Sequence, residues 1–235
     1  AAVENLQKAY DNFFRKAKMK VKGQKGFPQF KKRYGKQSFR VKQCVKINDS
    51  KLVIPKFLEG IPIIEHRKIE GEIKFATISK NKAGQYYASI TTELDIQPLP
   101  ERTEAIGYDL NVHGMVDSNG KVEINPRPAK QYAKRLKLLS QRVSRTQKTS
   151  NGRTKAKQKL AKLHLKVHNK REDHLHKLSR RIINENQVIC VEDLCVSDML
   201  AKTEPDDRKE PRWKEKKRHR DIQDCGFYSF VQKLV

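Results

Sequence analysis

Two short apolar segments of this chain each lead into an acidic residue. Residues 105–108 read Ala-Ile-Gly-Tyr before Asp109, and residues 187–191 read Gln-Val-Ile-Cys-Val before Glu192. Both have the composition of strands inside a sheet, the second one buried on both faces. Burying a carboxylate is costly unless it is paired or binds a metal. Taken alone, Asp109 also fits a turn aspartate beside Asn111, but two acids at neighbouring strand ends would give Mg²⁺ the oxygen ligands it prefers.

The segments between these strands follow a recognisable order. A hairpin with its turn at residues 117–120 comes after Asp109, and helices then lead to the strand before Glu192. A strand with an acid, a hairpin, helices and a parallel strand with a second acid is the layout of an RNase H-like fold. In such a site two divalent metals about 3.5–4 Å apart catalyse in-line phosphodiester cleavage, one activating water and the other stabilising the leaving oxygen. A third or fourth acid usually joins from a later helix.

The helices between the two strands are strongly basic. Apolar residues recur at helical spacing from Tyr132 to Val143 and from Leu160 to Ile182, which predicts an antiparallel helical hairpin. Residues 126–185 hold 19 Lys and Arg against 3 acids, a net charge of +16. Like charges four residues apart destabilise a helix in water, so this face is expected to bind phosphates; the alternative, a soluble face, usually mixes both signs. The predicted contacts are Lys134, Arg135, Arg142, Arg145, Lys155, Lys159, Lys162, Lys166, Lys170 and Arg171.

The N-terminal part has a different pattern. Residues 1–14 have helical periodicity, and a basic loop that mixes aromatic residues with cations follows. Lys31, Lys32 and Arg33 of this loop are predicted to contact phosphates, with some aromatic stacking nearby. The alternative is a solvated loop that holds two phenylalanines of the core.

Several short alternating segments in residues 38–96, among them one strand at 39–47, predict a small antiparallel β-barrel. Pro55 and the sequence Gly-Ile-Pro at 60–62 interrupt the pattern. The predicted domains are residues 1–35, a helical end and basic loop; 36–97, the barrel; 98–104, a linker; and 105–235, an incomplete nuclease domain.

Composition narrows the classes of partner. The net charge of +25 indicates that the binding partner is a polyanion, with nucleic acid as the first candidate and an anionic membrane as the second. There is no apolar run long enough to span a bilayer, and no secretory signal is recognised at the N-terminus. The four cysteines form no C-x-x-C pair, which favours reduced thiols in a cytoplasm over a zinc site. Residues 203–220 are highly charged and are expected to form a mobile loop.

Five separated motifs resemble one family in the order in which it carries them. They are the sequences at residues 105–112, 139–145, 159–164, 169–179 and 188–194, joined by weaker likenesses at 6–14 and 26–31. Together they resemble the TnpB family, transposon-encoded RNA-guided DNA nucleases with a RuvC-like domain, related to type V CRISPR effectors.

The resemblance implies roles for particular residues. Asp109 matches the first catalytic aspartate of the RuvC-like site and Glu192 the catalytic glutamate, with Mg²⁺ as the metal. Residues 38–96 correspond to a wedge barrel that holds guide RNA and the start of the target duplex. Residues 224–234 correspond to the helix before a zinc ribbon, so zinc and a third catalytic aspartate are expected only downstream of residue 235. Asn111 and His113 depart from the family's pattern.

The sequence therefore predicts an α+β or α/β protein, a wedge-like β-barrel followed by a RuvC-like domain with an inserted basic hairpin. Both ends are expected to be cut from a longer protein. The predicted function is RNA-guided DNA endonuclease activity at the prokaryotic nucleoid, with guide RNA and target DNA as partners and neither a membrane nor a small-molecule cofactor. The alternatives are a catalytically incomplete RNA- and DNA-binding protein from a decayed transposon gene, and an unrelated basic protein associated with nucleic acid.

Overall fold

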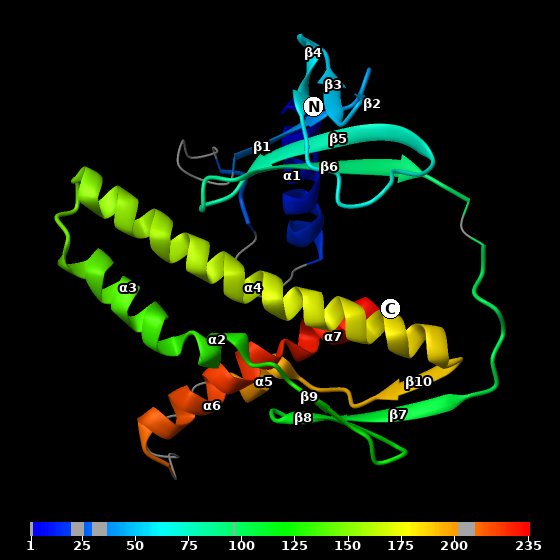
Figure 1. Ribbon diagram of the computed structural model, residues 1–235, viewed down its shortest axis with the longest axis vertical. Coiled ribbons are helices and arrows are strands. Elements are labelled where there is room, and N and C mark those ends of the chain that lie inside the picture. The colour runs from blue at the N-terminus through cyan, green and yellow to red at the C-terminus, as the bar shows by residue number, and fades with distance from the viewer. Residues whose placement is uncertain (1, 20–25, 30–36, 96, 202–209) are drawn as a thin grey trace. The chain divides into compact units, whose positions relative to one another are not determined.

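The computed structural model of the chain describes residues 2–19, 26–29, 37–95, 97–201 and 210–235 (Figure 1). The chain divides into two compact units, Ala1–Gln97 and Pro98–Val235. Neither helix nor strand is found at the described positions between residues 94 and 104, where two prolines and several charged side chains disfavour regular structure.

The first unit begins with one helix and continues with six strands. Helix α1 confirms the helical periodicity at the N-terminus, and the ring of Phe27 packs edge-on against Phe13 of this helix, with 5.3 Å between ring centroids. The elements are α1 (Ala2–Lys18), β1 (Gln37–Val41), β2 (Lys46–Asn48), β3 (Lys51–Ile54), β4 (Phe57–Pro62), β5 (Glu72–Lys80) and β6 (Tyr86–Glu93).

These six strands form two three-stranded antiparallel sheets, in the orders β1-β5-β6 and β2-β3-β4. One hydrophobic core joins the sheets, with Leu52 and Ile54 from one and Ala76 from the other. The predicted closed barrel is wrong for the residues that the structure describes, because no ladder of hydrogen bonds joins the two sheets there. The first unit is instead a pair of small sheets around a shared core.

The predicted single strand at residues 39–47 is also wrong. Cys44 has a positive φ of 53°, a conformation that extended strands exclude, and the chain passes there from β1 in one sheet to β2 in the other. Residues 60–62 were expected to interrupt the strand pattern, but β4 includes them. Pro62 is tolerated because β4 is an edge strand and Pro62 is its last residue.

The second unit is built on one four-stranded sheet of order β10-β7-β8-β9. Strands β7 and β10 are parallel, as predicted from the order of the segments, and β8 and β9 form the predicted hairpin. The elements are β7 (Ala105–Leu110), β8 (Gly114–Asp117), β9 (Val122–Ile124), α2 (Pro128–Gln131), α3 (Ala133–Arg145), α4 (Asn151–Glu185), β10 (Val188–Val191), α5 (Val196–Met199), α6 (Arg212–Cys225) and α7 (Phe227–Leu234).

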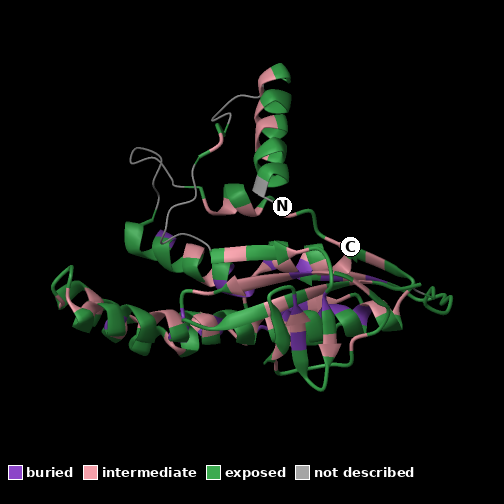
Figure 2. Cartoon of the chain, turned by 90° about the horizontal axis from the view of Figure 1, so that it is seen from above, coloured by how far each residue is buried: buried purple, intermediate pink, exposed green. Residues whose placement is uncertain are grey.

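Helices cover one face of this sheet, and the hydrophobic core of the second unit lies between that face and the helices. Ile106, Tyr108 and Leu110 of β7 belong to one buried core with Leu175 of α4 and Phe230 of α7. Figure 2 colours the chain by burial and shows buried positions on both strands and helices. Burial of this apolar surface is the main favourable term that holds the sheet to its helices. The core therefore fixes β7, the strand that carries Asp109.

Helices α3 and α4 pack side by side, which confirms the predicted hairpin (Figure 1). Ser150 caps α4 by accepting a hydrogen bond from the Arg153 backbone at 3.1 Å, and the Arg153 guanidinium donates to the carbonyls of Val143 and Thr146 at the end of α3. The hairpin is long, since the 35 residues of α4 span about 52 Å.

The expectation of a mobile loop at residues 203–220 is wrong for its C-terminal half. Residues 212–220 belong to α6, and Glu215 on this helix is buried. No helical periodicity is visible in the sequence here because the first half of α6 is almost entirely charged. The apolar residues that this helix buries, including Ile222 and Cys225, lie in its second half. Residues 203–209 lie outside the described part of the chain.

Candidate active site and nucleic-acid interface

Asp109 lies on the face of the sheet opposite the helices. Burial alternates along β7, so that Ile106, Tyr108 and Leu110 point into the core while Ala105 and Asp109 are exposed. Asp109 pairs with Val116 of β8 and is thus a strand residue. The turn that follows is shaped by Asn111, whose Oδ1 accepts a hydrogen bond from the His113 backbone at 3.2 Å.

Glu192 directly follows the neighbouring strand, β10, which ends at Val191. The parallel register of β7 and β10 ends with the pair Tyr108 and Val191, and the next residues along the chain are Asp109, still in β7, and Glu192, just after β10. Adjacent strands lie about 4.8 Å apart, and residues level with one another in a parallel pair point to the same face. Both carboxylates are exposed, so neither suffers the desolvation that burial in a sheet would cause.

The prediction that the second strand is buried on both faces is wrong within the described residues. Val188, at the start of β10, is 52% exposed, and Ile124 on β9 is 75% exposed. The pairing places both on the same face as Asp109, since Val188 is level with Ala105, and Ile124 pairs with Gly114. The two acids therefore stand at one end of an apolar sheet face that the described residues leave open.

A close approach of two strands supports this end of the sheet. A side chain on Gly114 would place its Cβ 2.7 Å from the Glu123 carbonyl oxygen, closer than such atoms normally come. Glycine thus permits β8 and β9 to pair directly after the turn that follows Asp109. On the opposite face, Glu123 pairs with Arg181 of α4 at 2.5 Å, which ties the edge strand to the long helix.

The donor chemistry of the two acids suits a hard cation such as Mg²⁺, which prefers carboxylate oxygens. Two carboxylates are fewer than the protein ligands of a complete metal site. Among the residues that the structure describes, no group of three or more His, Cys, Asp or Glu side chains is placed to hold a metal ion. Asp109 and Glu192 are hence two carboxylates of a suitable type at the ends of neighbouring strands.

Two acids on α6 have structural partners, which the sequence pattern did not reveal. The carboxylate of Asp224 is buried and accepts hydrogen bonds from the backbone N–H groups of Ala129 and Lys130, both at 3.0 Å. Asp221 forms an ion pair with Arg127 at 2.7 Å. These contacts hold the first turn of α2 against α6, so Asp224 acts as an N-terminal cap from a distant helix.

Removing this cap is expected to destabilise the second unit. Asp224→Ala leaves two backbone N–H groups without their charged acceptor, which corresponds to a loss of about 3 kcal/mol in the free energy of unfolding. Urea denaturation followed by circular dichroism measures the change. Exposed Asp193 provides a control, because Asp193→Ala is expected to alter stability by less than about 0.5 kcal/mol. Equal stability of the Asp224→Ala variant and the parent chain would contradict the capping role.

The basic hairpin presents most of its predicted contacts to solvent. Nine of the ten predicted residues on α3 and α4 are exposed. Arg171 is the exception, because it is half-buried and donates a hydrogen bond to the Gln223 carbonyl at 3.0 Å. Lys166 and Lys170 lie over the Tyr132 ring, at 5.4 Å and 5.2 Å from its centroid, and their hydrogen bonds lower the pKa of Tyr132.

The other predicted contacts, Lys31, Lys32 and Arg33, lie outside the described residues. The described part of the chain contains no helix whose length and apolar character would allow it to cross a bilayer.

Comparison with known proteins identifies the family of this chain. Residues 85–203 match the model of the OrfB_IS605 family, which is described as "Probable transposase". Two curated relatives share about a third of their aligned residues with it. The "Putative RNA-guided DNA endonuclease" of Streptomyces pristinaespiralis is 32% identical over 204 residues, which cover 85% of this chain and 49% of that protein. The "Putative RNA-guided DNA endonuclease InsQ" of Escherichia coli K12 is 33% identical over 202 residues, 84% of this chain and 48% of that protein.

The matched residues of the family model run from β6 to just beyond α5 and include both Asp109 and Glu192. The chain spans about half the length of the two curated relatives. The resemblance found in the sequence motifs is thereby confirmed, and the chain belongs to the TnpB family of probable transposases.

Proposed function

We propose that this chain forms part of an RNA-guided DNA endonuclease, to which it contributes two catalytic acids and a basic surface for nucleic acid. The observation that carries the proposal is the placement of Asp109 and Glu192, which each come directly after the last pair, Tyr108 and Val191, of two parallel strands and are both exposed. The names of the two curated relatives support the same activity. The strand order of the second unit is compatible with an RNase H-like, RuvC-like domain, and we assign it to that class as part of the proposal.

Asp109 and Glu192 would hold Mg²⁺ through their carboxylate oxygens. When bound, the metal supplies Lewis-acid stabilisation of the charge that develops during phosphodiester cleavage. Two carboxylates are fewer than a two-metal site requires, so we propose that Asp109 and Glu192 are joined by further acids of the complete protein. The exposed sheet end on which they stand gives a DNA strand direct access to both oxygen donors.

The basic hairpin of α3 and α4 would bind the backbone of guide RNA or of the RNA–DNA duplex. Its charge of one sign over residues 126–185 favours phosphates, whose neutralisation releases counterions. The two small sheets of the first unit are proposed to contact guide RNA and the start of the target duplex. This assignment follows the family resemblance and does not require a closed barrel.

Binding by the hairpin is expected to weaken steeply with salt. The logarithm of the affinity should fall by about 0.9 per neutralised phosphate for each tenfold rise in salt on a duplex, and by about 0.7 on a single strand. The double variant Lys159→Ala, Lys162→Ala should lower the magnitude of this slope by the amount that corresponds to one or two lost phosphate contacts. Lys177→Ala is the matched control, because Lys177 already pairs with Asp173 at 2.9 Å. Filter binding at several salt concentrations measures the slopes, and an affinity independent of salt would contradict the assignment.

The proposed activity is tested with the protein encoded by the complete reading frame, expressed with the RNA transcribed beside it. Cleavage of a plasmid that carries the matching target should require the RNA and a divalent metal. The competing function is nucleic-acid binding without cleavage, which is favoured because the described residues contain no group of three or more His, Cys, Asp or Glu side chains placed to hold a metal ion. Binding to RNA and DNA with no metal-dependent cutting would establish that alternative.

A further inference from the structure

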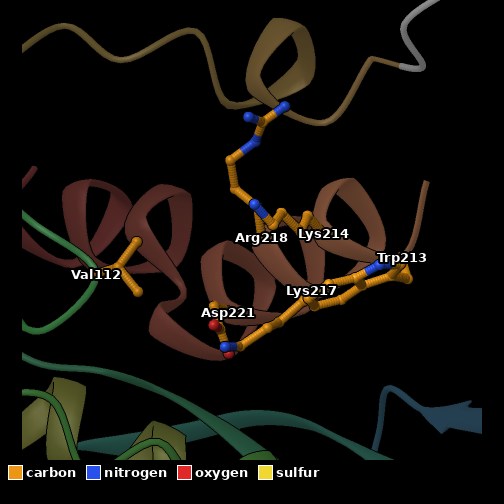
Figure 3. A pocket seen from close by; sticks show the side chains of 6 residues that line it. All are labelled: Val112, Trp213, Lys214, Lys217, Arg218 and Asp221. Carbon is orange, nitrogen blue, oxygen red and sulfur yellow. The ribbon is translucent and has the colours of Figure 1, made fainter. Parts of the chain in front are cut away.

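A small pocket on α6 combines an exposed aromatic ring with several cations. Its volume is about 320 Å³. Trp213 has 62% of its surface exposed, although a tryptophan gains more than most side chains from burial. Figure 3 shows the side chains that line the pocket, with Val112 on the opposite side from Trp213. The lining residues are Val112, Trp213, Lys214, Lys217, Arg218 and Asp221.

The charge in this pocket is positive. Lys214, Lys217 and Arg218 supply three cations, of which Arg218 also lies 3.9 Å from the Glu210 carboxylate, and the carboxylate of Asp221 is engaged by Arg127 at 2.7 Å. Lys214 lies over the Trp213 ring, with its Nζ 6.0 Å from the ring centroid. A flat exposed ring beside three cations matches the chemistry of a nucleotide, since the base can stack on the ring while the phosphates meet the cations.

The pocket also lies near the candidate catalytic acids. Val112 comes three residues after Asp109, so their Cα atoms are at most about 11 Å apart. The sulfur of Cys225 on α6 lies 3.3 Å from the Val112 carbonyl, and this contact keeps the helix beside the end of β7. Because Asp109 lies on the sheet face opposite the helices, a DNA strand held on Trp213 would have to pass around the end of β7, beside Val112, to reach it.

We propose that the Trp213 pocket binds one unpaired nucleotide of the DNA strand that is to be cut, by stacking its base on the indole and by contacts from Lys217 and Arg218 to its phosphates. This inference rests on the proposed function, because it names the substrate contact of the same site. A single strand is preferred, since a base paired within a duplex cannot offer its whole face to the ring.

The chain offers a direct optical test, because Trp213 is its only tryptophan. Titration of the 235-residue chain with a twelve-nucleotide thymidine strand, in the presence of a chelator, should quench the indole emission and saturate. In filter binding, which needs no indole, Trp213→Ala should weaken binding of this strand about 5- to 150-fold, the range expected for loss of one stacked base. Trp213→Phe should restore most of the affinity, and Lys217→Ala should lower the magnitude of the salt slope by about 0.7. Tyr228→Ala is the matched control, since Tyr228 is an equally exposed aromatic residue of the same unit outside the pocket.

Unchanged emission at saturating strand, or equal affinity of the Trp213→Ala variant and the parent chain, would overturn the proposal. Quenching by a uridine strand but not by the thymidine strand would overturn the assignment to DNA. The chelator separates this test from catalysis, and Asp109→Asn should leave the quenching unchanged. If quenching is observed while Asp109→Asn still cuts normally, the proposed catalytic role fails and the strand-binding pocket stands.

Discussion

Asp109→Asn is expected to abolish DNA cleavage by the complete protein with its RNA, and Glu192→Gln is expected to do the same. Asp109 and Glu192 each follow the last paired residues of β7 and β10, so each variant removes a charged oxygen ligand from the proposed site. Loss of several kcal/mol of charge stabilisation in the transition state corresponds to a fall in rate of more than about 1,000-fold. Plasmid cleavage followed over time at fixed Mg²⁺ measures the effect.

Both substitutions preserve side-chain size, and both sites are exposed, so the fold is expected to survive. Glu185→Gln serves as a control with the same loss of charge at an exposed position on the last turn of α4. It should cut at the parent rate. Nucleic-acid binding should persist in all three variants, and its loss in both Asp109→Asn and Glu192→Gln would mean that these acids are structural.

Phe230→Ala is expected to destabilise the second unit more than any surface change. The ring is fully buried, within a core that includes Ile106 and Tyr108 of β7. Truncation of a buried phenylalanine leaves a cavity and typically costs about 3–5 kcal/mol in the free energy of unfolding. Because the same core fixes β7, the variant should also lose activity at temperatures where the parent chain remains folded.

Urea denaturation measures this loss of stability, with Tyr228→Ala as the neighbouring control. Tyr228 is 68% exposed on the same helix, so its truncation should change the unfolding free energy by less than about 0.5 kcal/mol. A loss below about 1 kcal/mol for Phe230→Ala would show that α7 does not anchor the sheet as the core suggests.

The helices and turns that are determined by neighbouring residues could be predicted from the sequence. The helical hairpin followed from apolar residues repeated every three or four positions, and the turn at residues 117–120 followed from its sequence Asp-Ser-Asn-Gly. In the structure, Asp117 Oδ1 accepts the backbone N–H groups of Asn119 and Lys121, at 2.9 Å and 2.8 Å. The parallel pairing of β7 and β10 was also predictable, because the intervening hairpin and helices provide the crossover that parallel strands need.

Features that depend on long-range contacts were not predictable from local patterns. Asp224 caps a helix through the backbone of Ala129, 95 residues earlier in the chain, and nothing beside it in the sequence indicates this. The predicted single strand at residues 39–47 failed at Cys44, whose positive φ the alternating pattern did not indicate. The pocket at Trp213 arises because α6 packs beside the loop after β7, a contact between segments about 100 residues apart.

The pairing of Asp109 and Glu192 in one metal site is most directly tested by Mn²⁺ binding, since Mn²⁺ takes the same hard oxygen ligands as Mg²⁺. Electron paramagnetic resonance of the complete protein counts free and bound Mn²⁺ without requiring cleavage. The parent protein should bind the ion, and Asp109→Asn and Glu192→Gln should each weaken its binding about tenfold or more, while Glu185→Gln should not. Equal Mn²⁺ affinity in the parent protein and in both variants would contradict the shared site and the catalytic role assigned to these two acids.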